Sequence, residues 1–152
     1  MKRIKNPWLG IEGYNCFGCC PDNPNGMHMT FSEEGEDIVS YWLPSQNHIS
    51  WVNTLHGGVQ AALLDEICGW VIFRKCNSAG VTGKLELKYH KAIHLEPLTL
   101  KAHIVSNRGR VVIVEGTIYN QAGEVCTVAT ATYFVASQQQ AKDMGFLEAE
   151  TE

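Results

Sequence analysis

The residues best suited to chemistry are His56, Gly57 and Gly58, followed eight residues after Gly57 by Asp65. The His-Gly-Gly segment stands at the start of a predicted helix. Backbone N–H groups there have no acceptor within the helix and lie at the positive end of its dipole. The two glycines leave these N–H groups uncovered, and such groups can stabilise the oxyanion that forms when a carbonyl is attacked. The segment therefore predicts an oxyanion site.

Asp65 lies midway along an otherwise apolar helix. Burying a carboxylate is costly unless it is paired or functional, and a carboxylate in such a setting suits a general base or a nucleophile. The alternative is a salt bridge to a nearby lysine or arginine, or exposure at an edge. The His-Gly-Gly segment favours the catalytic role. Glu66 points about 100° away from Asp65 around the helix, and we expect it to pair with a lysine or arginine.

Helix geometry separates the two candidate groups. Gly57 and Asp65 lie roughly 12 Å apart along one helix axis, so they cannot both contact one carbonyl carbon. A two-fold dimer with antiparallel helices would bring Gly57 of one chain near Asp65 of the other. We therefore expect a homodimer with two composite sites.

One helix and a succession of strands must position these residues. Apolar residues recur at helical spacing from Gly57 to Lys75, and so little of this helix is polar that it must be buried. Runs rich in Val, Ile, Thr and Tyr predict strands. The predicted strands are residues 27–31, 38–43, 83–92, 99–106, 111–119 and 124–136. Residues 1–25 (the leader) are expected to form a loop, and residues 138–152 (the tail) a frayed polar segment.

These elements predict an α+β fold in a single domain, residues 1–152, with an antiparallel sheet of about six strands wrapped around a long central helix. The sheet covers the helix on one side only. A second copy of the chain is the simplest cover for the other side.

Charge and hydropathy exclude several classes of partner. The formal net charge is −4, which argues against nucleic-acid binding because phosphate neutralisation needs a basic stripe. No apolar run reaches the roughly 18 residues of a membrane span. No apolar segment follows the basic N-terminus, as a secretory signal would require. We expect a cytoplasmic protein with no membrane partner.

The six cysteines do not predict a metal site. Cys16, Cys19 and Cys20 are close in sequence, but a second C-x-x-C pair is absent, and no fourth ligand beyond His28 is obvious. Without a secretory signal, disulfides are not expected either.

The His-Gly-Gly segment, followed after a short gap by an acid on a long buried helix, resembles the PaaI-type hotdog thioesterases. The similarity runs from residue 15 to residue 136 and includes the leader segments 15–19 and 22–27 and the strand segment 85–89. It implies the hotdog fold and hydrolysis of a small or medium acyl-CoA to free acid and CoA. It also implies a homodimer or homotetramer and no metal or organic cofactor.

The resemblance implies roles for individual residues. Gly57 would donate its N–H to the thioester oxygen, with Gly58 beside it in the substrate site. His56 would hold the loop and polarise the carbonyl. Asp65 would act as general base on water or as nucleophile, and the sequence does not choose between the two. Thr82 would lie near the attacking water.

Two positions depart from the family's pattern. Members commonly carry Asn or Gln six residues before the His; this chain has Ser50, so Asn53 or Asn47 is expected to substitute. One turn after the acid, Gly69 replaces a hydroxyl residue, which puts one water contact in doubt and leaves room for the acyl group.

Arg108 and Arg110 lie in a predicted hairpin turn and suit the phosphates of coenzyme A, with an ordinary solvated hairpin as the equal alternative. Two other functions stay open. One is an acyl-thioester hydratase or dehydratase on the same fold, although the His/Asp signature usual in those enzymes is absent. The other is a non-catalytic acyl-CoA binding protein.

Overall fold

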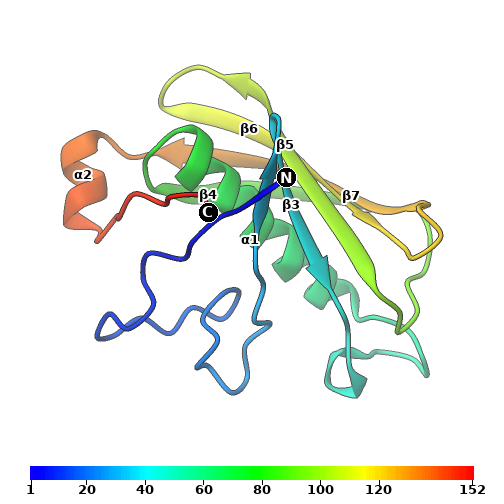
Figure 1. The fold of residues 1–152 in the computed structure, drawn as a ribbon. Helices are drawn as coiled ribbons and strands as arrows, with labels where there is room; N and C mark the ends of the chain where they lie inside the picture. The colour runs from blue at the N-terminus through cyan, green and yellow to red at the C-terminus, as the bar shows by residue number, and fades with distance from the viewer.

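A single antiparallel sheet curves around one long helix in the computed structural model, which describes residues 1–152 (Figure 1). The sheet has seven strands in the order β1-β2-β3-β5-β6-β7-β4. The elements are β1 (Lys2–Arg3), β2 (Ser32–Glu34), β3 (Asp37–Trp42), the 3-10 helix η1 (Gln46–His48), α1 (Gly57–Lys75), β4 (Gly80–Tyr89), β5 (Leu98–Asn107), β6 (Val111–Tyr119), β7 (Val125–Val135) and α2 (Gln138–Asp143). The α+β architecture is as predicted, with one strand more than expected.

The helix α1 has the predicted bounds because its periodic apolar residues and its caps agree. His56 is the N-cap, and Asn77 follows the C-cap with a φ of +49°, a left-handed conformation that asparagine tolerates. Its buried residues, among them Leu64 and Cys68, pack on the sheet. Gly116 of β6 allows this close approach, because a Cβ there would lie 3.0 Å from the Cys68 sulfur and 3.2 Å from the Leu64 side chain.

Alternating burial of side chains along β7 shows which face of the sheet packs against the helix. Ala129, Ala131 and Tyr133 are buried, while Thr130 and Phe134 between and beyond them are exposed. Successive side chains of a strand point to opposite faces, so the small alanines and Tyr133 face α1. The strand directly beside β7 is β4, which follows α1 in the chain.

The strand β4 forms one edge of the sheet and pairs with β7 alone. It is ten residues long, and its register shifts between Thr82 and Lys84. Most of its residues are exposed, including the apolar Val81 and Tyr89. A long edge strand with unpaired backbone groups is a template for pairing with another chain.

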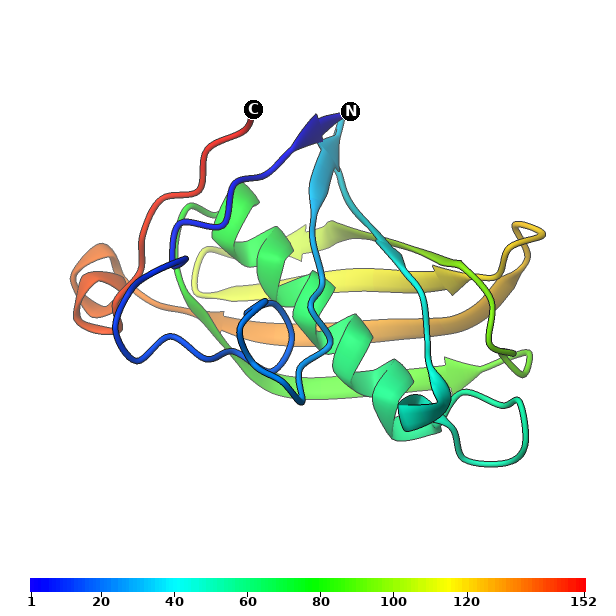
Figure 2. The ribbon, with the colours of Figure 1, turned by 60° about the horizontal axis from the view of Figure 1, so that its bottom comes forward.

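The leader crosses the face of α1 that the sheet leaves free, and the tail runs past the C-terminal end of this helix (Figure 2), where Arg74 donates to the Ala149 carbonyl. Trp8 and Tyr14 of the leader pack with Phe31, Trp70 and Phe73 in an aromatic cluster. We expected a second copy of the chain to cover this side of the helix, but much of that cover comes from the chain itself.

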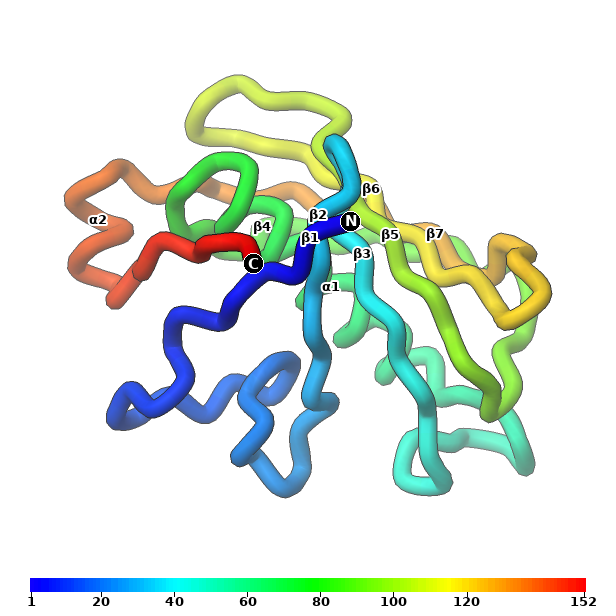
Figure 3. Tube along the Cα trace, viewed as in Figure 1, coloured from blue at the N-terminus to red at the C-terminus, as the bar shows by residue number.

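Two predicted segments were wrong, and a third was displaced: β4 covers Gly80–Tyr89, whereas a strand was expected over residues 83–92. Residues 27–31 form no strand: Met27, Met29 and Phe31 are buried in alternation without sheet pairing, and the strand begins at Ser32. The tail is not frayed throughout, because it contains α2 with a capping box and returns to the N-terminus, where Thr151 bridges Ile4 (Figure 3). Both segments are fixed by contacts with residues far away in the chain, which a local sequence pattern does not reveal.

Neither helix has the length and hydropathy needed to cross a membrane.

Candidate active site

Asp65 is the centre of a small hydrogen-bonded cluster between α1 and the edge of the sheet. The Thr82 hydroxyl of β4 donates to Asp65 Oδ1 at 2.8 Å, and Tyr133 Oη of β7 lies 2.9 Å from the same oxygen. Tyr133 also donates to the backbone carbonyl of Asp65 at 2.8 Å. Both side-chain contacts converge on Oδ1, so Oδ2 accepts no hydrogen bond from the chain and is free for a water or substrate.

Tyr133 is a member of this cluster that we did not predict. It stands directly opposite Thr82 in the β4–β7 register, so the two side chains reach α1 together. Burial raises the pKa of the Tyr133 phenol far above its ordinary value, and the neighbouring Asp65 carboxylate adds to the shift. Tyr133 therefore keeps its proton and acts as a donor. The sequence signal was present only as a tyrosine in a strand, 68 residues from Asp65.

Asp65 does not form the salt bridge that was its alternative explanation. Its hydrogen-bond donors are two neutral hydroxyls, and no lysine or arginine pairs with it. The side chain is half-buried rather than fully buried. A partly accessible carboxylate, fixed by two hydroxyls and with one oxygen free, can accept a proton from water or attack a carbonyl carbon.

His56 caps α1 in a way that fixes its tautomer. The Gly58 N–H donates to His56 Nδ1 at 2.8 Å, so Nδ1 carries no proton and the neutral ring is protonated at Nε2. The Gly57 N–H, at the first position of the helix, has no acceptor within the helix. The Gly57 carbonyl accepts the Tyr89 hydroxyl at 2.8 Å. The Gly57 N–H and the His56 Nε2–H are thus free to donate at this end of α1, while the Gly58 N–H already donates to His56.

Ser50 and Asn53 lie in the exposed loop before α1. The Ser50 N–H donates to the Thr54 carbonyl, and its hydroxyl makes no hydrogen bond. Asn53, with a φ of +50°, accepts the Leu95 N–H on its side chain at 3.1 Å. Its carbonyl lies 2.9 Å from His94 Nδ1. Within one chain, Asn53 therefore ties two loops together, and neither residue contacts Asp65.

Gly69 lies one turn after Asp65 on α1, as predicted. A Cβ at Gly69 would meet only Tyr133 Oη, at 3.8 Å, so the space beside the Asp65–Tyr133 contact is open. Arg108 and Arg110 are exposed in the hairpin between β5 and β6, and neither forms an ion pair. Arg110 lines a surface hollow together with Lys75.

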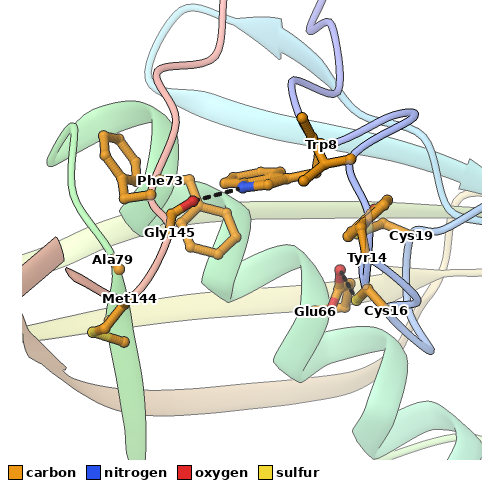
Figure 4. Close-up of a pocket in the computed structure, with 12 residues that line it drawn as sticks. Trp8, Tyr14, Cys16, Cys19, Glu66, Phe73, Ala79, Met144 and Gly145 are labelled. Carbon is orange, nitrogen blue, oxygen red and sulfur yellow. Dashed lines mark hydrogen bonds between the residues drawn. The ribbon is translucent and has the colours of Figure 1, made fainter. Parts of the chain in front are cut away.

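A second group of reactive side chains lies on the other side of α1. Cys16 and Cys19 of the leader meet Glu66 there, with the three ligand atoms within 4.8 Å of one another (Figure 4). Glu66 does not pair with a lysine or arginine as expected; it accepts the Trp70 indole N–H at 3.2 Å and the Cys16 thiol at 3.4 Å. These are the residues of the chain that could hold a metal ion. His28, the ligand suggested by the sequence, contacts the Asn23 carbonyl instead.

Comparison with known families decides the class of the protein. The sequence model of the thioesterase superfamily matches residues 52–127, half of the chain, which includes α1 and the strands β4, β5 and β6. The chain belongs to the thioesterase superfamily. No curated protein matches it.

Solved structures of thioesterases share the fold, which is the hotdog fold. The thioesterase superfamily protein RHA08564 is 27% identical, with a TM-score of 0.70; the match covers 74% of this chain and 59% of that one. A hypothetical thioesterase from Streptococcus pneumoniae, solved with coenzyme A, is 27% identical, with a TM-score of 0.67 over 72% of this chain and 90% of its own. A Streptococcus mutans protein bound to acetyl-CoA is 22% identical, with a TM-score of 0.67 over 72% of this chain and 89% of its own.

Proposed function

We propose that the protein hydrolyses the thioester of a small or medium acyl-CoA to the free acid and CoA. The observation that carries the proposal is the free Oδ2 of Asp65, which Thr82 and Tyr133 leave open while they fix Oδ1. The coenzyme A bound to the related Streptococcus pneumoniae protein supports an acyl-CoA ligand. Structures have also been solved of variants of that protein in which an aspartate or a threonine is changed to alanine, the residue types of Asp65 and Thr82.

In this reaction Asp65 Oδ2 either takes a proton from the attacking water and later passes it to the leaving thiolate, or attacks the thioester carbon itself. The second route forms a mixed anhydride at Asp65, which water then hydrolyses to the free acid. The Gly57 N–H and the His56 Nε2–H stabilise the negative charge that develops on the thioester oxygen. The thiolate of CoA leaves and takes up a proton. Arg108 and Arg110 provide exposed guanidinium groups for the CoA phosphates. No metal or organic cofactor takes part in these steps.

The proposed active unit is a homodimer, which can pair further into a homotetramer. Gly57 and Asp65 are two turns apart on α1, and neither lines a main cavity of the single chain. Pairing of two β4 edges would set two copies of α1 side by side and antiparallel. Each site would then combine Gly57 of one chain with Asp65 of its partner. We further propose that the chain is of the PaaI type, because its His-Gly-Gly segment and its leader segments 15–19 and 22–27 resemble that branch.

Turnover of an acyl-CoA panel tests the proposal. Short, long and aromatic acyl-CoAs are incubated with wild type and with Asp65→Ala, and substrate loss is followed by chromatography, because the six free cysteines would react with a thiol reagent. We expect wild type to turn over at least one class and Asp65→Ala to lose at least roughly a hundredfold. A folded wild type that is inert on every thioester contradicts hydrolysis and favours the hydratase or the binding protein, which crotonyl-CoA hydration and CoA binding then separate.

A mixing experiment tests the composite site. Gly57→Pro removes the N–H donor without backbone strain, because proline is favoured at the first position of a helix and His56 already has the extended backbone that precedes proline (φ −60°, ψ 134°). The added Cβ would meet the Tyr89 side chain at 3.5 Å, an ordinary contact distance. Mixed after dissociation, Gly57→Pro and Asp65→Ala should recover about a quarter of wild-type activity, since half of the dimers are mixed and each has one intact site. Mixtures no more active than the single variants contradict the shared site.

A further inference from the structure

The leader and α1 bring together three side chains that the proposed hydrolysis does not use. Cys16 Sγ, Cys19 Sγ and a carboxylate oxygen of Glu66 lie within 4.8 Å of one another at the wall of a mainly apolar pocket (Figure 4). We propose that Cys16, Cys19 and Glu66 bind a divalent metal ion, Zn²⁺, that pins the leader to α1.

Ligand spacing in the protein fits a tetrahedral ion. Cys16 Sγ lies 3.4 Å from Glu66 Oε1. A tetrahedral Zn²⁺, with Zn–S of about 2.3 Å and Zn–O of about 2.0 Å, separates a sulfur from an oxygen ligand by about 3.5 Å. This pair already has the separation that the ion requires, and all three ligand atoms lie within 4.8 Å of one another, so side-chain movements can complete the site.

The charge around the cluster favours a cation. Two thiols and a carboxylate carry up to three negative charges when ionised, and the twelve residues lining the pocket include no lysine, arginine or histidine. Burying such a group without a counter-charge is costly. A divalent ion would supply the missing charge and displace the thiol protons to solvent.

Outer contacts hold two of the three ligands in place, as they do in known metal sites. Tyr14 Oη lies 2.9 Å from Cys19 Sγ and itself accepts the Asn6 amide at 2.8 Å. The Trp70 indole N–H donates to Glu66 Oε1 at 3.2 Å. Cys19 and Glu66 are thus oriented by groups that are not ligands themselves.

The ligand types select the metal. Two thiolates exclude Mg²⁺ and Ca²⁺, which prefer oxygen, and two sulfurs with one carboxylate suit Zn²⁺. Three protein ligands leave a fourth position for a water molecule, which the pocket of about 430 Å³ has room to hold. Cys20 is not a ligand, because its sulfur faces the Tyr14 carbonyl at 3.7 Å.

Metal content and metal affinity test the site. The full-length protein, purified under reduction without chelator, should contain one zinc per chain by mass spectrometry. Co²⁺ added to the metal-free protein should produce thiolate-to-cobalt charge-transfer absorption. Cys16→Ser and Cys19→Ser should weaken Zn²⁺ binding by more than the ten- to hundredfold that loss of an outer-shell partner costs. Glu66→Gln, which can still accept the Trp70 indole N–H, should weaken binding less while preserving the local fold.

Matched controls separate binding from misfolding. Cys76→Ser changes a half-buried cysteine at the end of α1 and should keep wild-type zinc content and Co²⁺ absorption. Metal-free wild type and metal-free Cys16→Ser should melt at the same temperature, with Zn²⁺ raising only that of wild type. Reduced, folded wild type that binds Zn²⁺ no more tightly than Cys16→Ser overturns the proposal, as does a Cys16–Cys19 disulfide in place of metal in protein isolated anaerobically.

Discussion

Two adjacent carboxylates of α1 serve two different regions of the molecule. Asp65 faces the edge of the sheet, where Thr82 and Tyr133 hold it and one oxygen stays open. Glu66 faces the leader, where the Trp70 indole and the Cys16 thiol use the same oxygen. The first region is open along β4, and the second is covered by the leader and the tail (Figure 2). One helix therefore separates an accessible site suited to chemistry from a covered site suited to holding the chain together.

The largest expected effect is a loss of activity on changing Asp65 in the open region. Asp65→Asn keeps an oxygen for Thr82 and Tyr133 but cannot accept a proton from water or attack a carbonyl, so kcat/KM for the best acyl-CoA should fall at least roughly a hundredfold. The urea midpoint should stay close to that of wild type. Asp37→Asn, a half-buried carboxyl 3.5 Å from His103 on β5, is the matched control and should keep full activity. Equal losses in the two variants would contradict a special role for Asp65.

The next largest effect is a loss of stability on changing Trp8 in the covered region. Trp8 packs on Trp70 and Phe73 with ring centroids 5.9 and 5.2 Å away and donates its indole N–H to the Gly145 carbonyl at 3.0 Å. Because Trp8 is half-buried, Trp8→Ala should cost about 2 kcal/mol of unfolding free energy, less than a fully buried tryptophan. Urea denaturation measures this. Trp51→Ala, at a side chain that is 81% exposed, should change it by no more than about 0.5 kcal/mol. If both variants are equally stable, the leader contributes little to the fold.

A smaller effect sharpens the description of the open region. Thr82→Val preserves the shape of the side chain but removes its hydroxyl, leaving Tyr133 as the donor to Asp65 Oδ1. We expect kcat/KM to fall about tenfold, equivalent to about 1.4 kcal/mol of transition-state stabilisation. Steady-state kinetics measure the change, and Thr130→Val on the outer face of β7 is the control. An unchanged kcat/KM would mean that Tyr133 alone positions the carboxylate.

The smallest effect concerns the covered region and depends on pH. Glu33 of β2 pairs with Arg74 and Lys75 at 2.9 and 3.2 Å, and the Arg74 hydrogen bond lowers the pKa of Glu33 from its ordinary value of 4.5. A lowered folded-state pKa gives stability that is present above pH 4.5 and is lost as the pH falls through the folded-state pKa. Glu33→Gln should therefore lower the unfolding free energy by at most about 1 kcal/mol near neutral pH. In acid, wild type and variant should converge; a gap that persists there would point to packing instead.

The sequence was most informative where local pattern and tertiary packing agree. The bounds of α1 and of β6 were predicted as the structure has them, since apolar periodicity and turn residues mark both. The contacts of Tyr133 with Asp65 and of Glu66 with Cys16 could not be predicted from local patterns, because these partners are 68 and 50 residues apart in the chain. Thr82 was found through the family's pattern, and the structure brings it to Asp65. The catalytic roles themselves stay predictions that the kinetic experiments test.

The cover on the helix also shows what the sequence pattern left out. An apolar helix needs a partner surface, and a second copy was the simplest source of one when the leader was taken for a loop. Trp8 and Tyr14 in that leader supply much of the surface instead. This packing is hard to predict, because the sequence of the leader itself shows only turn residues and isolated aromatics.

The two edges of the sheet differ in a way that limits strand-to-strand assembly of copies of the chain. One edge is the ten-residue β4, and the other is the two-residue β1, against which the tail lies with hydrogen bonds from Lys5 to Glu150 and from Glu152 to Arg3. A filament built strand to strand needs two free edges on every subunit. Here a copy that joins through β4 presents only a blocked edge to the next. Edge-to-edge assembly is therefore self-limiting at two chains, which protects a protein with a long exposed strand from fibrous aggregation.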